Sequence, residues 1–201
     1  SPPHSASVTQ TRLPEFKTLV RRAMLRQLSR QEVLEILAAQ YELFVKTSGH
    51  SPDFIDSHLH VHQLPVVMDV LIDFVQRLPF GQRPYIRNSW MAMAELRRQG
   101  LPWLKAMLIG VFGARLNKKL REHDLATNIG FAGIYDFNKW AEYPQLFPKF
   151  AACLQAPNGI LVTHPGFDDD WRRCEFGTLQ SFHGRPNRFI YGTATSAIPF
   201  P

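Results

Sequence analysis

The hydrophobic positions in the first 80 residues switch between helical and extended periods. Apolar side chains three and four residues apart predict a helix that begins near Phe16. A second helix is predicted to begin at Ser29, because Ser-Arg-Gln-Glu is a capping-box pattern, and to end at the turn residues 47–52. A third helix is predicted after Pro65. Between the second and third helices, residues 54–62 alternate in polarity, which predicts a strand.

The rest of the chain continues this alternation. Residues 84–88 and 159–164 have the short apolar pattern of strands. Residues 102–120 and 140–154 have a helical pattern. In the first of these segments, Gly110 and Gly113 interrupt the pattern. Strands that alternate with helices are typical of an α/β fold with parallel strands.

The length limits which α/β architecture can form. A complete (β/α)8 barrel typically needs about 250 residues, and this chain has 201. We therefore expect an irregular or incomplete (β/α) barrel. Residues 1–201 are expected to form a single domain, in which the polar, proline-containing residues 1–13 are a loop.

Composition and charge narrow the functional classes. The chain is 45% hydrophobic and 20% charged, as in ordinary globular proteins. Its net charge of +6 is spread over scattered pairs of Lys and Arg, so we expect no nucleic-acid partner. No apolar run is long enough to cross a membrane, and no signal peptide opens the sequence. Two cysteines form no disulfide framework, which favours a reducing compartment.

The strongest chemical signal is the run Asp56, His58, His60 and His62. On a strand, residues two apart face the same side, so all four side chains would project together. Imidazole and carboxylate groups bind zinc and similar divalent ions. The run therefore predicts a metal site, in which some members orient a ligand rather than bind the ion. The alternative is a set of core or surface histidines satisfied by hydrogen bonds.

Weaker signals lie downstream. His164 follows an apolar strand, at the place where α/β folds carry catalytic groups, and three aspartates come soon after it. Arg87 ends another predicted strand and could bind a polar substrate group or form a structural ion pair. Tyr135 and Asp136 are candidates for contact with a sugar, although single aromatic residues more often belong to the core. Phosphate-binding glycine motifs, a Gly-x-Ser-x-Gly elbow and His-Glu-x-x-His are absent from the sequence.

The run Asp-Ser-His-Leu-His-Val-His, followed by Pro65, resembles the signature strand of the YdjC/ChbG-like carbohydrate deacetylases, which include hopanoid-associated relatives. Arg87, the sequence His164-Pro165-Gly166 and the segment with Arg173, Glu175 and Leu179 resemble later features of that family. The similarity covers most of residues 16–182. It implies a cytoplasmic hydrolase with an irregular barrel of the glycoside hydrolase/deacetylase type. The expected reaction removes acetyl groups from N-acetylated amino sugars or oligosaccharides, with one divalent metal ion, Mg or Zn.

The resemblance also implies roles for single residues. His58 matches the family's metal-binding histidine of the Asp-Ser-His run. The family's remaining ligands and its base come from Ala-Asp-Asp and Gly-x-His motifs, and neither occurs in this sequence. We therefore expect the segment that carries them to precede Ser1, and we expect the chain as given to lack part of its metal site. Strand edges left without neighbours could then support a homodimer.

The other candidates receive supporting roles. His164 is the expected catalytic acid for the leaving amine. The side chains expected to orient His58, or to serve as alternative ligands, are His60, His62 and Asp56. The side chains expected to contact substrate are Arg87, Tyr135 and Asp136.

Two other readings stay open. The first is another metal-dependent hydrolase, an amidohydrolase or phosphoesterase, with His164 and the aspartates 168–170 as further ligands. The second is a non-catalytic carbohydrate-binding relative, whose sugar binding would not depend on metal.

Overall fold

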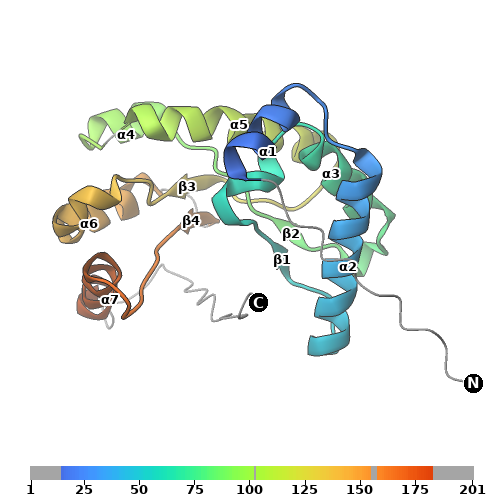
Figure 1. Ribbon diagram of the computed structural model, residues 1–201. Coiled ribbons are helices and arrows are strands. Elements are labelled where there is room, and N and C mark those ends of the chain that lie inside the picture. Colours follow the sequence, from blue (N-terminus) through green and yellow to red (C-terminus); the bar gives the residue numbers. More distant parts are fainter. Residues whose placement is uncertain (1–14, 102, 155–157, 183–201) are drawn as a thin grey trace, which may run out of the picture. The chain divides into compact units, whose positions relative to one another are not determined.

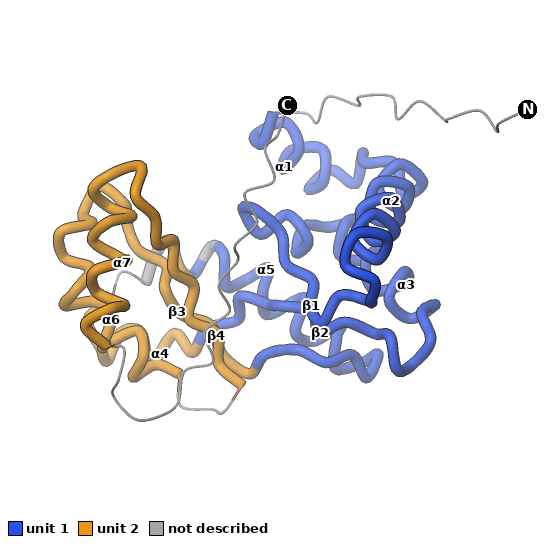
Figure 2. The backbone as a smooth tube through the Cα atoms, turned by 90° about the horizontal axis from the view of Figure 1, so that it is seen from below, with its two compact units in different colours: residues 1–91, 107–128 blue, residues 92–106, 129–201 orange. Residues whose placement is uncertain are grey.

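The computed structural model of the protein describes residues 15–101, 103–154 and 158–182 (Figure 1). Contacts divide the chain into two compact units (Figure 2). Unit 1 comprises residues 1–91 and 107–128, and unit 2 comprises residues 92–106 and 129–201. The expected single domain stays a prediction, and the expected loop 1–13 lies outside the described residues.

Two helices open unit 1 where the sequence predicts them. Helix α1 spans Phe16–Met24 and helix α2 spans Arg30–Ser48. The Ser29 hydroxyl accepts a hydrogen bond from the Glu32 N–H at 3.2 Å, which satisfies one of the free amides at the start of α2. Gly49, with φ of +79°, ends the helix in the left-handed conformation that glycine adopts readily. The predicted capping is therefore confirmed.

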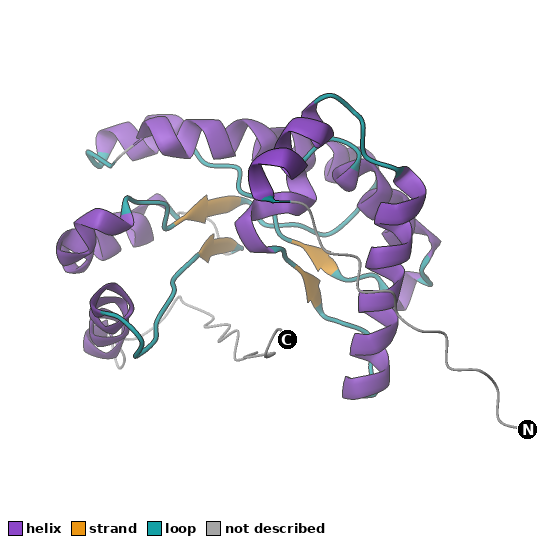
Figure 3. Ribbon diagram, viewed as in Figure 1, coloured by secondary structure: helices purple, strands orange, loops and turns teal. Residues whose placement is uncertain are grey.

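A strand–helix–strand arrangement follows within unit 1 (Figure 3). Its elements are β1 (Phe54–Ile55), the 3-10 segment η1 (His58–Gln63), α3 (Val67–Arg77), the 3-10 turn η2 (Phe80–Gln82) and β2 (Tyr85–Ile86). The two strands are parallel, with Ile55 opposite Ile86, and on its other side Ile86 bridges Thr127. The strand predicted over 54–62 is therefore wrong beyond Ile55.

Helix α5 (Trp103–Glu122) runs without the interruption that its two glycines suggested. A Cβ at Gly113 would lie 2.4 Å from the carbonyl carbon of Ser89. The glycine thus lets the backbone of α5 approach the loop after β2 closely, and its role is packing rather than helix termination.

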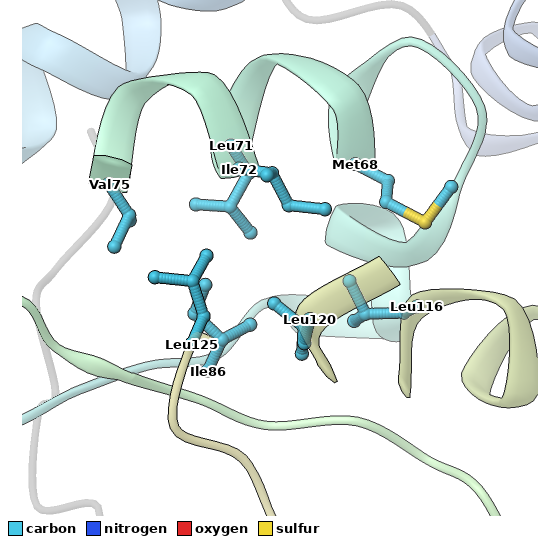
Figure 4. Close-up of a cluster of buried hydrophobic side chains, with 8 residues drawn as sticks. All are labelled: Met68, Leu71, Ile72, Val75, Ile86, Leu116, Leu120 and Leu125. Atoms are coloured by element: carbon cyan, nitrogen blue, oxygen red, sulfur yellow. The ribbon is translucent and has the colours of Figure 1, made fainter. Parts of the chain in front are cut away.

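Helix α3, strand β2 and helix α5 enclose the core of unit 1 (Figure 4). The buried side chains of this cluster are Met68, Leu71, Ile72, Val75, Ile86, Leu116, Leu120 and Leu125. Leu37 from α2 and Phe74 from α3 pack against them. This core fixes the carboxyl end of β2, where the candidate site residues begin.

Unit 2 contains a second strand–helix–strand arrangement. Its elements are α4 (Met93–Arg98), β3 (Gly130–Ala132), the 3-10 segment η3 (Phe137–Glu142), α6 (Tyr143–Cys153), β4 (Gly159–Leu161) and α7 (Asp170–Phe182). Strands β3 and β4 are parallel, with Phe131 opposite Ile160. The predicted strand after 158 is confirmed over three residues. The pattern at 140–154 forms a 3-10 segment followed by a helix.

The core of unit 2 is aromatic. Tyr135 and Tyr143 are almost fully buried, with ring centroids 5.1 Å apart, and Phe147 and Phe150 pack beside them. Tyr135 also meets Phe137 of η3 edge-on, with centroids 5.0 Å apart, and Phe147 of α6 meets Phe182 of α7 at 4.7 Å.

The described residues thus form a mixed α/β structure, rich in helices, with two small parallel sheets. The predicted α/β class is confirmed, and the barrel stays a prediction. Within the described part of the chain, none of the helices has both the length and the apolar character that a membrane crossing requires.

Candidate functional site

The histidine run folds as a turn rather than as a strand. The Ser57 N–H donates to the Asp56 carboxylate at 2.5 Å, and the Ser57 hydroxyl accepts from the His62 N–H at 3.0 Å. Leu59 and His60 both have positive φ, +53° and +58°. Short polar side chains compete with sheet hydrogen bonds in this way. Asp56, His58, His60 and His62 therefore do not share one strand face, and that expectation is wrong.

His62 is buried inside this turn. Its Nε2 lies 2.6 Å from the Arg87 carbonyl oxygen, which can only accept, so Nε2 carries the proton. Its Nδ1 lies 2.5 Å from the Ser57 hydroxyl, which donates to it. Burial, and secondly the Arg87 charge, lower the pKa of His62 from its usual 6.5 to about 4. With both nitrogens engaged, His62 holds the turn together, and a role of its ring as an alternative metal ligand stays a prediction.

Arg87, directly after β2, ties the turn to the sheet. Its Nε donates to the Asp56 carboxylate at 2.6 Å, and a terminal nitrogen donates to His60 Nδ1 at 2.9 Å. Another terminal nitrogen lies 3.4 Å from the Ser57 carbonyl oxygen. The guanidinium is buried, whereas the Asp56 side chain is 42% exposed. The structure thus shows the structural ion pair that was one of the two roles expected for Arg87. The other role, a contact with substrate, stays a prediction.

His58 opens η1 and is exposed. Within the described residues, no hydrogen bond or ion pair engages its ring. The same part of the chain contains no group of three or more His, Cys, Asp or Glu side chains that could hold a metal ion. The described residues therefore do not form a complete metal centre, and the role of His58 as a metal ligand stays a prediction.

A buried polar network beside this turn was mostly missed by sequence reasoning. Asn88 and Asn128 exchange hydrogen bonds: each backbone carbonyl accepts from the other residue's side-chain amide, at 2.8 and 2.9 Å. The Asn88 amide also donates to the Thr127 hydroxyl at 2.7 Å. Next to them, the Ser89 hydroxyl donates to Gln63 Oε1 at 2.8 Å. Asn128 follows Thr127, and the parallel bridge between Thr127 and Ile86 brings Asn128 beside Asn88.

Site residues of unit 2 gather after β4. The His164 N–H donates to a carboxylate oxygen of Glu175, and its ring Nδ1 lies 3.8 Å from the other oxygen. The ring meets Phe137 edge-on, with centroids 5.3 Å apart, and Trp171 at 5.8 Å. The His164 side chain is 41% exposed. The structure thus presents a held but accessible imidazole at the position that sequence reasoning selected.

The three aspartates at 168–170 stabilise the start of α7. The Asp169 carboxylate accepts from the Arg172 N–H at 3.1 Å, and the Arg172 guanidinium pairs with Asp168 and Asp169. Asp170 pairs with Arg173. These carboxylates therefore stabilise a helix N-terminus and its first turn.

Tyr135 and Asp136 have local roles. Tyr135 is buried, and its hydroxyl donates to Glu175 at 2.5 Å, so burial and this carboxylate raise its pKa. Its ring offers no exposed face to a sugar. Asp136 caps η3 by accepting from the Asn138 N–H at 3.1 Å. Their contact with substrate stays a prediction, and Glu175 is the functional candidate that these neighbours reveal.

Comparison with known proteins decides the family. Residues 4–187 match the sequence model of the YdjC-like proteins. The chain belongs to the YdjC-like family. The match includes the histidine turn of unit 1 and the His164 segment of unit 2, and it confirms the resemblance found in the sequence.

Curated YdjC-like relatives share this similarity over different lengths. A carbohydrate deacetylase of Xenopus laevis is 40% identical over 172 residues, which cover 73% of this chain and 52% of the relative. A chitooligosaccharide deacetylase of Proteus mirabilis is 41% identical over 51 residues, 25% of this chain and 20% of the relative. A chitooligosaccharide deacetylase of Yersinia enterocolitica is 38% identical over 58 residues, which cover 29% of this chain and 23% of the relative. The chain thus spans at most about half the length of these relatives. No solved structure matches it.

Proposed function

We propose that this protein is a metal-dependent hydrolase that removes acetyl groups from N-acetylated amino sugars or their oligosaccharides. The family match and the names of the relatives, carbohydrate deacetylase and chitooligosaccharide deacetylase, support the reaction class. The irregular (β/α) barrel belongs to the same proposal. Its support is the pair of strand–helix–strand arrangements, each with parallel strands.

One observation carries the metal part of the proposal. Of the three imidazoles in the turn, His62 is engaged at both nitrogens and His60 accepts from Arg87, whereas no described residue engages His58. We assign His58 as one ligand of a divalent ion, Mg or Zn. Because the described residues hold no complete donor set, residues outside them would supply at least part of it.

The surrounding residues would keep that imidazole in place. The Ser57–His62 bond closes the turn, and Arg87 holds Asp56 and His60 against the end of β2. Such supporting contacts fix the orientation of a metal-binding side chain. A bound divalent ion supplies an activated water and polarises an amide carbonyl.

His164 is assigned as the acid that protonates the leaving amine. Its ring is accessible, and its backbone and side chain are both anchored, which suits a group that must deliver a proton in a fixed direction. The Phe137 and Trp171 rings beside it restrict its rotation.

The test compares His58→Ala with His50→Ala, a second exposed histidine of unit 1, in the full-length protein. Bound metal is measured by elemental mass spectrometry, and acetate release is measured with diacetylchitobiose as substrate. We expect His58→Ala to lose both metal and activity, by at least about 100-fold, because a direct ligand is removed. His50→Ala should keep both. A His58→Ala variant with wild-type metal content and turnover would refute the assignment.

A non-catalytic carbohydrate-binding relative is the second candidate. It is favoured by the absence of a complete metal-binding group from the described residues. A chelator distinguishes the two: in the deacetylase it abolishes acetate release, whereas in a binding module sugar affinity is unchanged and no acetate appears.

A further inference from the structure

Glu175 is a buried carboxylate that needs an explanation. It lies on α7 with 0% exposure. Burying an ionised carboxylate is costly unless hydrogen bonds and an opposite charge compensate it. In the described part of the chain, the one ion pair that reaches Glu175 is formed with the His164 ring, and no Lys or Arg takes part. The burial of this charge is therefore coupled to His164.

Both carboxylate oxygens of Glu175 are fixed. Oε1 accepts from the Tyr135 hydroxyl at 2.5 Å, and Oε2 accepts from the His164 N–H. Tyr135 is itself held in the aromatic core of unit 2 by Tyr143 and Phe150. The carboxylate thus has one orientation, set by the core on one side and by the backbone after β4 on the other.

The His164 ring is oriented toward this carboxylate. Nδ1 lies 3.8 Å from Oε1, which is an ion-pair separation rather than a hydrogen bond. Phe137 and Trp171 contact the ring, and their own centroids are 4.6 Å apart. The ring is nevertheless 41% exposed. One nitrogen therefore faces a buried negative charge, while part of the ring is open to a substrate.

We propose that Glu175 is a positioning residue for His164: it sets the direction of the ring and balances its positive charge before proton transfer. This inference rests on the proposed deacetylase function. In the step it serves, the C–N bond of the tetrahedral intermediate breaks and its electron pair moves to nitrogen. The nitrogen takes the proton from His164, which becomes neutral. The proton that the attacking water gave up passes to solvent, and His164 recovers one proton from solvent, so the count balances. The products are acetate and the free amino sugar.

A purely structural role is the alternative, because Glu175 also links the segment after β4 to α7. A double-mutant cycle separates the two roles. If Glu175 acts through His164, Glu175→Gln should have little further effect once His164 is removed. If it only supports the fold, its effect should be the same in both backgrounds.

The experiment uses the full-length protein and diacetylchitobiose. We expect Glu175→Gln to lower kcat about 100-fold, within the range for general acid catalysis, with KM changed less than about twofold. His164→Ala should lower kcat at least as much, and the double variant should match His164→Ala within about twofold. Glu142→Gln makes the same chemical change on the exposed surface of unit 2 and should behave as wild type.

A conservative variant guards against misfolding. Glu175→Asp keeps the charge and should recover at least about tenfold of the kcat lost in Glu175→Gln, with circular dichroism confirming that both fold. Additive losses in the double variant, or a Glu175→Gln enzyme with wild-type kcat, would overturn the positioning role while leaving the deacetylase function intact. A wild-type protein that releases no acetate would overturn both.

Discussion

The buried ring of His62 should make unit 1 less stable at acid pH. Its pKa is lowered from 6.5 to about 4 by burial and by the Arg87 charge. As the pH falls, the unfolded chain takes up the proton near 6.5 but the folded chain only near 4. The contribution of His62 to the free energy of unfolding is therefore fully present above pH 6.5, and it is lost as the pH falls from 6.5 to about 4. A pKa difference of this size corresponds to a change of about 3 kcal/mol in the free energy of unfolding.

The perturbation is His62→Gln, which removes the titration but keeps an amide that can donate to the Arg87 carbonyl. Free energies of unfolding are measured by urea titration between about pH 7.5 and pH 4, with a chelator present so that bound metal does not contribute. The variant should be less stable than wild type at neutral pH. The difference should shrink by about 3 kcal/mol at the acid end.

The control is His50→Gln, a substitution at an exposed histidine of the same unit. It should follow the wild-type pH dependence throughout. If the stability difference between wild type and His62→Gln is the same at pH 7.5 and at pH 4, His62 is not buried in the neutral form and the described turn is incorrect.

Three substitutions test the packing, each by urea unfolding. Gly113→Ala should cost about 1–3 kcal/mol, because a Cβ there would lie 2.4 Å from the backbone of the loop after β2. Leu120→Ala should cost about 2–5 kcal/mol because it leaves a cavity in the unit 1 core, whereas Leu43→Ala, at a 64% exposed position, should change stability by less than about 0.5 kcal/mol. Asn128→Ala should cost about 1–3 kcal/mol, because buried groups of Asn88 lose their partners. Wild-type stability in any of the three buried variants would contradict the corresponding contact.

Helices could be predicted from sequence where local signals and burial agree. Ser29 caps α2 because its hydroxyl meets the Glu32 amide within one helical turn, and this depends only on neighbouring residues. Gly113 shows the limit of such reasoning. Glycine usually weakens a helix, but its neighbour here is a backbone segment 24 residues earlier, and no local pattern reveals that contact.

The histidine run shows the same limit for the site. Alternating polarity predicted a strand, yet the Ser57 hydroxyl and the Asp56 carboxylate bind nearby backbone amides and form a turn. The partner that fixes His62, the Arg87 carbonyl, is 25 residues away. The sequence could therefore indicate which residues carry chemistry, but the division of roles among His58, His60 and His62 follows from tertiary contacts.

Glu175 was noticed only as part of a resemblance. A single Glu in an amphipathic helix usually faces solvent, and its burial depends on the Tyr135 hydroxyl and the His164 amide, which come from two other segments. The structure supplies the reason to connect it with His164.

The proposed function is the release of acetate from N-acetylated amino sugars in a metal-dependent reaction. Its most direct test is the acetate released from diacetylchitobiose by the full-length protein, with and without a chelator. We expect acetate and a free amine in equal amounts, loss of both with chelator, and recovery when Zn or Mg is restored. Release that continues unchanged with chelator, or no release from any N-acetylated sugar tested, would contradict it.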